Sequence, residues 1–115
     1  SIINLDYEQT DSKATVASLI KASPAIVFSA TYCPYCKKAK ALLSELKADF
    51  KVVEVDKDPK GSTYKQQLKD ITGRTSVPAV FVGGQFIGGC NDGPGVFPLH
   101  KSGKLVPMLK KAGAL

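Results

Sequence analysis

The chain has 115 residues, the length of one domain, and we expect residues 1–115 to form a single domain. Its 43% hydrophobic and 23% charged residues are typical of a globular protein, and no apolar run approaches the roughly 20 residues of a membrane span. The opening "SIINLDYEQTDSK" lacks the apolar block of a signal peptide. We therefore expect a cytoplasmic protein, or an organellar one if a transit peptide has been removed.

The formal net charge of +6 favours anionic partners in general. The lysines, however, are spread along the chain without the arginine stripe and interleaved aromatics of a nucleic-acid surface. Most of them are expected on solvated helix faces. A small anionic substrate or an acidic protein partner fits the charge at least as well, and we expect no nucleic-acid partner.

The hydrophobic pattern predicts alternating helices and strands. Thr10 or Ser12 is expected to cap the first helix, and Ser62 and Gly73 to begin and end a later one. In chain order, the expected elements are a helix over 15–23, a strand over 25–30, a helix over 34–50, a strand over 51–56, a helix over 62–73, a hairpin over 79–89 and one or two short helices over 96–115.

This order of elements predicts the class of fold. A strand, a helix and a second strand form a crossover, which joins parallel neighbours in one sheet. The hairpin, whose tight turn is Gly83-Gly84, adds antiparallel strands to that sheet. The chain is therefore expected to be an α/β protein with a four-stranded mixed sheet and helices on both faces.

The motif CPYC places Cys33 and Cys36 at the start of the second predicted helix. Pro34 occupies the first helical position, so Cys33 lies in the N-cap region beside unsatisfied backbone N–H groups. These donors and the helix dipole favour a thiolate at Cys33, and Lys37 and Lys38 add positive potential. Cys36 lies one turn further along the same face, more enclosed but close enough for a disulfide. The motif thus predicts an exposed attacking thiol and a sheltered resolving thiol.

Zinc binding and a static disulfide are the alternatives for this motif. A structural zinc site needs four ligands, and the chain offers Cys33, Cys36, Cys90 and His100. Their spacing matches no familiar zinc pattern, and zinc ribbons place CxxC on a glycine-containing knuckle rather than on a proline-started helix. A disulfide across so short a loop removes little chain entropy. Redox chemistry is favoured over both, and no metal is expected.

The segment "TSVPAVFV" places Pro78 at the start of a strand. Proline at that position either belongs to an edge strand or has a particular structural role. If its peptide bond is cis, the backbone N–H and C=O of Val77 point outward beside the two cysteines, where they could pair with a bound peptide or thiol. An ordinary edge-strand proline is the alternative, which the CPYC motif disfavours.

The chain resembles glutaredoxins, specifically the dithiol group with a CPYC active site. The resemblance rests on "TYCPYC", "TGRTSVPAVFVGG" and "FIGGCND", in this order and at the family's spacing, and extends from about Ala25 to the end. Thioredoxins proper usually carry tryptophan before CGPC, and this chain has no tryptophan. The resemblance implies a thioredoxin fold for a single glutaredoxin-like domain over 1–115, a cis bond before Pro78, and glutathione as the reductant.

The resemblance also implies an activity, glutathione-dependent thiol-disulfide oxidoreduction. Cys33 would attack glutathione mixed disulfides and protein disulfides, and Cys36 would resolve the protein adduct by forming an internal disulfide. Such enzymes have potentials of about −200 to −230 mV, near the glutathione poise. The implied partners are glutathione and glutathionylated or disulfide-containing proteins, with the chain acting as a monomer away from membranes.

The resemblance further implies which residues bind glutathione. The backbone of Val77, before Pro78, would hold the cysteine moiety, and Asn91 and Asp92 the γ-glutamyl end. Tyr35 would flank the sulfur. Each assignment is carried over from the motif that contains the residue.

Two basic residues are the candidates for the glycyl carboxylate of glutathione, Arg74 and Lys65. The family typically has a lysine three residues before the first cysteine, where this chain has Ala30. Lys65 stands at a helix position where the family often has glutamine. We expect Lys65 to compensate in part for Ala30.

Further departures lie in "CNDGPGVFPLH". The insertion "GPG" at 93–95 predicts a longer and looser loop before the last helices, at the edge of the γ-glutamyl subsite. Cys90 is expected to be a small, partly buried apolar residue, with glutathionylation or a regulatory disulfide as the alternative. His100 is expected on the surface.

Two other functions share the same cysteines. Some glutaredoxins hold a [2Fe–2S] cluster between two subunits through the first cysteine and glutathione, usually with CGFS or a small residue in place of Pro34, so Pro34 disfavours that function. A dedicated electron donor to a reductase, such as ribonucleotide reductase, would use Cys33 and Cys36 in the same way. The sequence does not separate this donor from the enzyme.

Overall fold

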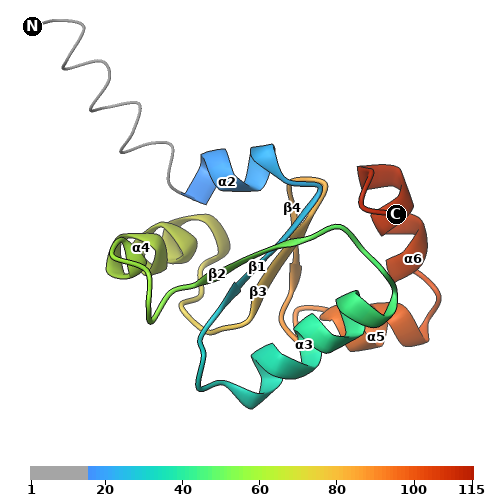
Figure 1. The fold of residues 1–115 in the computed structure, drawn as a ribbon, viewed down its shortest axis with the longest axis horizontal. Coiled ribbons are helices and arrows are strands. Elements are labelled where there is room, and N and C mark those ends of the chain that lie inside the picture. The colour runs from blue at the N-terminus through green and yellow to red at the C-terminus, as the bar shows by residue number, and fades with distance from the viewer. Residues whose placement is uncertain (1–15) are drawn as a thin grey trace, which may run out of the picture.

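The computed structural model describes residues 16–115. The expected caps at Thr10 and Ser12 therefore lie outside the described residues. The elements are α2 (Val16–Ala22), β1 (Ala25–Ser29), α3 (Pro34–Glu45), β2 (Lys51–Glu54), α4 (Gly61–Thr72), β3 (Ala79–Val82), β4 (Gln85–Gly88), α5 (Val96–Lys101) and α6 (Leu105–Ala112), as Figure 1 shows. The order predicted from the hydrophobic pattern is confirmed over this part of the chain.

The four strands form one mixed sheet in the order β2-β1-β3-β4 (Figure 1). β1 is parallel to β2, as expected from the intervening helix, and antiparallel to β3. β3 and β4 form the expected hairpin, and both turn glycines, Gly83 and Gly84, have positive φ values of 59° and 82°. Two consecutive positive φ values suit glycine because it has no Cβ to clash.

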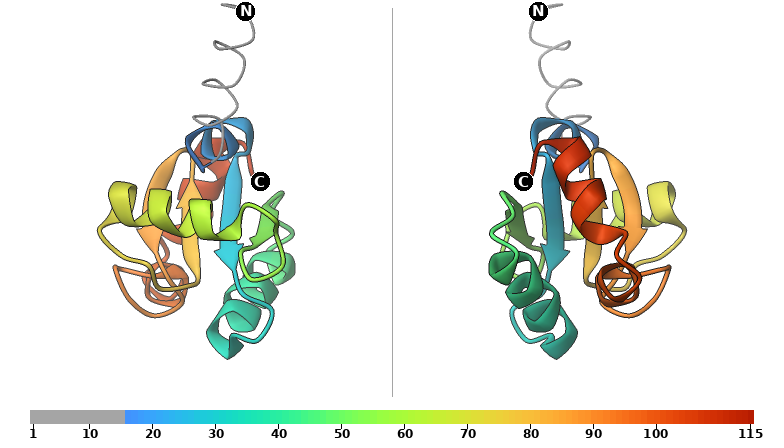
Figure 2. Two further views of the ribbon diagram at one scale, coloured as in Figure 1. Left: turned by 90° about the vertical axis from the view of Figure 1, so that its left-hand side faces the viewer. Right: turned by 90° about the vertical axis from the view of Figure 1, so that its right-hand side faces the viewer.

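Helices cover both faces of the sheet (Figures 1 and 2). A hydrophobic core lies on each face. Successive side chains of β1 alternate between the two cores, because strand residues point to opposite faces in turn. Ala25 and Val27 join the core beneath α3, α5 and α6, whereas Ile26 and Phe28 join the core beneath α2 and α4. A strand buried on both faces explains why residues 25–30 read as one continuous apolar run.

Helix α3 ends at Glu45, five residues before the end predicted from the apolar spacing. Lys47 has a φ of 60°, which an α-helix does not accommodate. The N–H of Ala48 donates back to the carbonyl of Leu43 at 3.0 Å, and the N–H of Asp49 donates to the carbonyl of Ala114 at 2.7 Å. The apolar spacing of a helix continues to residue 50 in the sequence. The hydrogen bond between Asp49 and Ala114, however, holds this segment outside the helix.

Helix α4 begins at Gly61, and the prediction that Ser62 caps it is wrong. Asp58 shapes the entry instead: its side chain accepts the N–H of Lys60 at 2.8 Å and its carbonyl accepts the N–H of Gly61 at 2.9 Å. The other end is as expected, with Gly73 at φ 77° closing the helix. No helix within residues 16–115 is both long and apolar enough to cross a membrane.

Candidate active site

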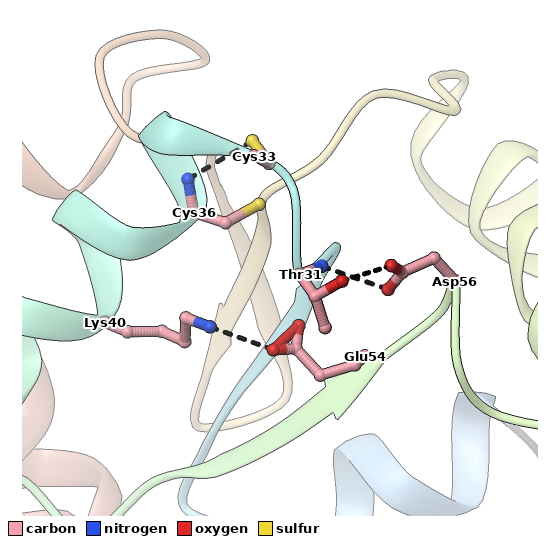
Figure 3. Close-up of polar contacts among 6 residues, drawn as sticks. All are labelled: Thr31, Cys33, Cys36, Lys40, Glu54 and Asp56. Carbon is pink, nitrogen blue, oxygen red and sulfur yellow. Dashed lines mark hydrogen bonds and ion pairs between the residues drawn. The ribbon is translucent and has the colours of Figure 1, made fainter.

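Cys33 occupies the N-cap of α3, directly before Pro34 at the first helical position. Its backbone is extended, with φ −90° and ψ 116°, so the sulfur turns back over the helix start. The Sγ atom accepts the backbone N–H of Cys36 at 3.3 Å (Figure 3) and lies 3.9 Å from the carbonyl oxygen of Val77. Cys33 is largely buried, with 9% of its surface exposed, so the prediction of an exposed attacking thiol is wrong, although Cys33 is less enclosed than Cys36 at 0%.

Cys36 is fully buried on the first turn of α3. Burial first, and then its hydrogen bond with Cys33, raise the pKa of the Cys36 thiol to about 11, although the Ala30 backbone and the Ser29 hydroxyl act in the opposite direction. A thiol with this pKa is protonated at neutral pH. Cys36 is thus the more enclosed of the two cysteines, as a resolving thiol would be.

The loop that carries Cys33 is held by Asp56, which follows the end of β2 at Glu54 (Figure 3). One carboxylate oxygen of Asp56 accepts the N–H of Thr31 at 3.0 Å, and the other accepts the Thr31 hydroxyl. The hydroxyl contact is the main reason why the pKa of Asp56 lies below its ordinary value of 3.8. β2 stops short of the predicted residue 56 because Asp56 turns toward this loop.

The Asp56 contacts predict an acid-dependent loss of stability. Because the carboxylate pKa is depressed in the folded state, its contribution is present above the unfolded pKa and disappears as the pH falls through the folded pKa. We expect Asp56→Asn to lower the melting temperature at neutral pH, and the difference from wild type to shrink toward about pH 2. Thermal unfolding across this range, with Asp49→Asn as the control, measures the effect. A difference that is constant with pH would contradict it.

A cavity of about 260 Å³ lies beside Cys33. Its wall includes Val77, whose carbonyl oxygen lies 3.9 Å from the Cys33 sulfur. The Val77–Pro78 peptide bond is cis. The lining residues are Tyr35, Arg74, Ser76, Val77, Pro78, Cys90, Asn91 and Asp92. Six of the seven residues expected to bind glutathione are thus brought together.

Lys65 is the exception among the expected ligands, since it is an exposed residue of α4 and is not part of the cavity wall. Ser76 lines the cavity but was not among the residues predicted from the sequence. Its position directly before Val77 in the "TSVP" motif was the available signal. Tyr35 is 54% exposed, and the ammonium of Lys38 lies 5.5 Å from the centre of its ring.

Arg74 reaches across the cavity wall to the loop over residues 89–95. Its Nη1 atom lies 3.2 Å from a carboxylate oxygen of Asp92, and its guanidinium lies 5.3 Å from the centre of the Phe86 ring. A Cβ at Gly93 would stand only 2.8 Å from Nη1. Two expected ligands, one basic and one acidic, therefore pair with each other, and glycine lets the loop pack against the guanidinium.

The 89–95 loop is held by its own backbone hydrogen bonds, so the prediction that it is loose is wrong. The N–H of Gly89 donates to the carbonyl of Asp92 at 2.8 Å, and the N–H of Gly95 donates to the carbonyl of Ile87 at 2.9 Å. The N–H of Val96, which begins α5, donates to the carbonyl of Gly89 at 2.9 Å. These backbone hydrogen bonds hold the loop in place before α5 begins at Val96.

The residues considered for zinc are not gathered into a site. Over residues 16–115, no group of three or more His, Cys, Asp or Glu side chains could hold a metal ion. Cys33, Cys36 and Cys90 are free thiols, and His100 is exposed. Cys90 is 2% exposed and burial raises the pKa of its thiol, which agrees with the expected small buried residue.

The fold and the cysteine pair together define a dithiol redox protein of the thioredoxin-fold class. The family profile of glutaredoxins matches residues 25–87. The chain belongs to the glutaredoxin family, whose members are glutathione-dependent thiol-disulfide oxidoreductases. The family resemblance seen in the motifs is thereby confirmed.

Relatives and solved structures agree with this assignment. The chain is 47% identical over 97 residues to "Glutaredoxin-C4, chloroplastic" of rice, covering 84% of this chain and 71% of that protein. It is also 47% identical over 97 residues to glutaredoxin-C2 of Arabidopsis thaliana, covering 84% and 85%. The structure of a buckwheat glutaredoxin–glutathione complex matches with a TM-score of 0.85 at 39% identity, covering 92% and 94%. The predicted thioredoxin fold is confirmed.

Proposed function

We propose that this glutaredoxin reduces glutathione mixed disulfides and protein disulfides, with Cys33 as the nucleophile and Cys36 as the resolving thiol. The observation that carries the proposal is the position of the Cys33 sulfur. It accepts a helix N-terminal N–H at 3.3 Å, the setting that stabilises a thiolate, and it lies beside a cavity suited to a peptide. Cys36, buried and protonated, stays out of the first attack.

The reaction on a glutathione mixed disulfide proceeds in two exchanges. The Cys33 thiolate attacks the glutathionyl sulfur, the disulfide of the substrate breaks, and the protein thiolate leaves and takes up a proton from solvent. The thiolate of a second glutathione then attacks the Cys33–glutathione disulfide. This exchange releases oxidised glutathione, one half of which comes from the substrate, and restores the Cys33 thiolate. One mixed disulfide is therefore reduced for each free glutathione thiol oxidised.

A protein disulfide requires the second cysteine. Attack by Cys33 leaves the substrate attached through one sulfur, with its other sulfur released as a thiol. Cys36 loses its proton and attacks the Cys33 sulfur, the bond to the substrate breaks, and the released thiolate is protonated. Two glutathione molecules then reduce the internal disulfide.

The 260 Å³ cavity supplies groups that complement glutathione, a peptide with two carboxylates and one ammonium. We assign the backbone of Val77, next to Pro78 in the cavity wall, to the cysteine moiety, and Asn91 and Asp92 to the γ-glutamyl end. Arg74, held by Asp92, offers a cation for a carboxylate. The buckwheat complex supports glutathione as the ligand of this cavity.

The proposal is tested by trapping the first intermediate. Cys36→Ser treated with oxidised glutathione should carry one glutathione on Cys33, because nothing within the chain resolves that adduct. Peptide mass spectrometry locates the adduct, and Cys33→Ser under the same treatment is the matched control. Modification of Cys90 instead of Cys33 would overturn the assignment.

Lys65 gives a second prediction about glutathione binding. It lies outside the cavity wall, but a long flexible side chain on α4 could contribute charge to an incoming carboxylate. We expect Lys65→Ala to raise the KM for glutathione by about twofold to fivefold, since an exposed charge contact contributes little energy. Steady-state kinetics at low ionic strength measure this, with Lys69→Ala, one turn along α4, as the control. An unchanged KM would remove Lys65 from the site.

We also propose that the chain acts as a single-domain monomer in the cytoplasm on disulfide-containing proteins. The name of the rice relative includes the word chloroplastic, so family membership alone does not fix the compartment. Light scattering measures the mass in solution. Fluorescent fusions with the complete gene product establish the compartment.

A further inference from the structure

A small polar cluster lies beneath the N-terminal turns of α3. Ser29, the last residue of β1, is the one polar side chain classed as fully buried within residues 16–115, at 0% exposure. Ser29 and Glu54 are register partners in the parallel pair β1–β2, so their side chains point to the same face of the sheet. The Ser29 Oγ and the Glu54 Oε1 are both buried without a hydrogen-bond partner. A buried hydroxyl without a partner is costly and calls for an explanation.

The side chain next to this hydroxyl is the resolving cysteine. Ala25 and Val27 pack against α3 from this face, and Ser29 continues the same alternation one step further along β1. On α3, Cys36 precedes the core residue Ala39 by one turn and so faces the sheet. The Ser29 hydroxyl and the Ala30 backbone are the groups that favour the ionised form of Cys36, although the Ser29 Oγ makes no hydrogen bond in the structure.

The charged side chains near Cys36 do not stabilise its thiolate, so a neutral hydrogen-bond donor is needed for that. Lys40, on α3, and Glu54, on β2, are two charged side chains of this face, and they pair at 2.9 Å (Figure 3). Because the two charges offset each other, neither adds a large net field at Cys36. Cys33 approaches from the loop, and its contact opposes ionisation of Cys36. The Ser29 hydroxyl is a neutral group that can donate a hydrogen bond to the Cys36 sulfur.

We propose that Ser29 is a positioning residue for the resolving step, whose hydroxyl donates a hydrogen bond to the Cys36 sulfur as that sulfur loses its proton and attacks Cys33. The Cys36–Cys33 disulfide forms, the bond from Cys33 to the substrate breaks, and the substrate thiolate takes up a proton from solvent. The proton of Cys36 passes to solvent, so the exchange balances. The inference rests on the proposed role of Cys36 as the resolving thiol.

The test measures internal disulfide formation in Ser29→Ala. After reaction with oxidised glutathione, acid quenching, alkylation and mass spectrometry follow the Cys33–Cys36 disulfide with time. We expect formation to slow by about tenfold or more, the effect of losing one hydrogen bond to a charged group. Its pH dependence should shift to higher pH, because the lost donor favours the thiolate. Ser44→Ala, at an exposed position of α3, should change neither quantity.

Two further comparisons separate this role from a structural one. In the Cys36→Ser background, Ser29→Ala should leave turnover of glutathione mixed disulfides unchanged, because Cys36 takes no part. Ser29→Thr and Ser29→Val have nearly the same shape and differ in the hydroxyl, so disulfide formation should be faster in the threonine variant even if both are less stable.

The outcomes distinguish the role of Ser29 from the proposed role of Cys36 as the resolving thiol. If wild type forms no internal disulfide, the proposed role of Cys36 fails. If wild type forms it and Ser29→Ala matches the wild-type rate and pH profile, the role of Ser29 alone fails. Equal rates for the threonine and valine variants would likewise overturn the role of Ser29.

Discussion

Cys33→Ser should lose at least about a thousandfold of the deglutathionylating activity, because removing the nucleophile leaves no group that can form the mixed disulfide. A serine hydroxyl at this N-cap can still accept the N–H of Cys36, as the Cys33 sulfur does at 3.3 Å, but it stays protonated. Cys36→Ser should keep activity within a few-fold on glutathione mixed disulfides, because a second glutathione completes that reaction. The same variant should lose most activity on protein disulfides.

The pKa of the resolving thiol sharpens this test. With the pKa of Cys36 raised to about 11, its thiolate is a minor species at neutral pH and becomes appreciable only as the pH rises toward that value. Brief alkylation of the wild type at neutral pH should therefore modify Cys33 and spare Cys36. Full activity in Cys33→Ser, or alkylation of Cys36 first, would contradict the assignment. Equal melting temperatures of the two variants establish that loss of activity is not loss of fold.

Gly61→Ala should destabilise the fold by about 3 kcal/mol or more. An added Cβ would stand 1.8 Å from the carbonyl oxygen of Val55, which is backbone and cannot rotate away. Helix α4 would have to move off the end of β2, where Tyr64 and Leu68 pack in the second core. Urea unfolding followed by circular dichroism measures the loss.

Gly103→Ala is the matched control for this substitution. Gly103 has a φ of 77°, but no atom lies within 4 Å of its would-be Cβ. We expect a cost of about 1 kcal/mol, that of placing alanine in the left-handed region. If Gly61→Ala were no more destabilising than Gly103→Ala, the close contact with Val55 would not limit the packing of α4.

Much of the fold follows from local pattern. The strand over 25–30, the proline-started helix and the Gly83-Gly84 hairpin each depend on neighbouring residues, and all three are found in the structure. The end of α3 and the start of α4 were placed wrongly. Both boundaries depend on partners elsewhere, since Asp49 pairs with Ala114 and Gly61 packs under Val55.

The candidate site divides in the same way. The sequence alone determined the redox pair, because a cysteine before Pro34 and another three residues later belong to one helix turn, whose geometry is local. Family motifs added the expected glutathione ligands, and six of these seven lie around one cavity, while their roles remain predictions.

Only the tertiary structure decided what surrounds that pair. It places the Val77 carbonyl 3.9 Å from the Cys33 sulfur across 44 residues of sequence, and it pairs Arg74 with Asp92 at 3.2 Å. It also buries the Ser29 hydroxyl without a hydrogen-bond partner at the end of β1. Such contacts depend on strand order and register, which hydrophobic periodicity does not fully specify, because a slip of two residues keeps every side chain on its own face.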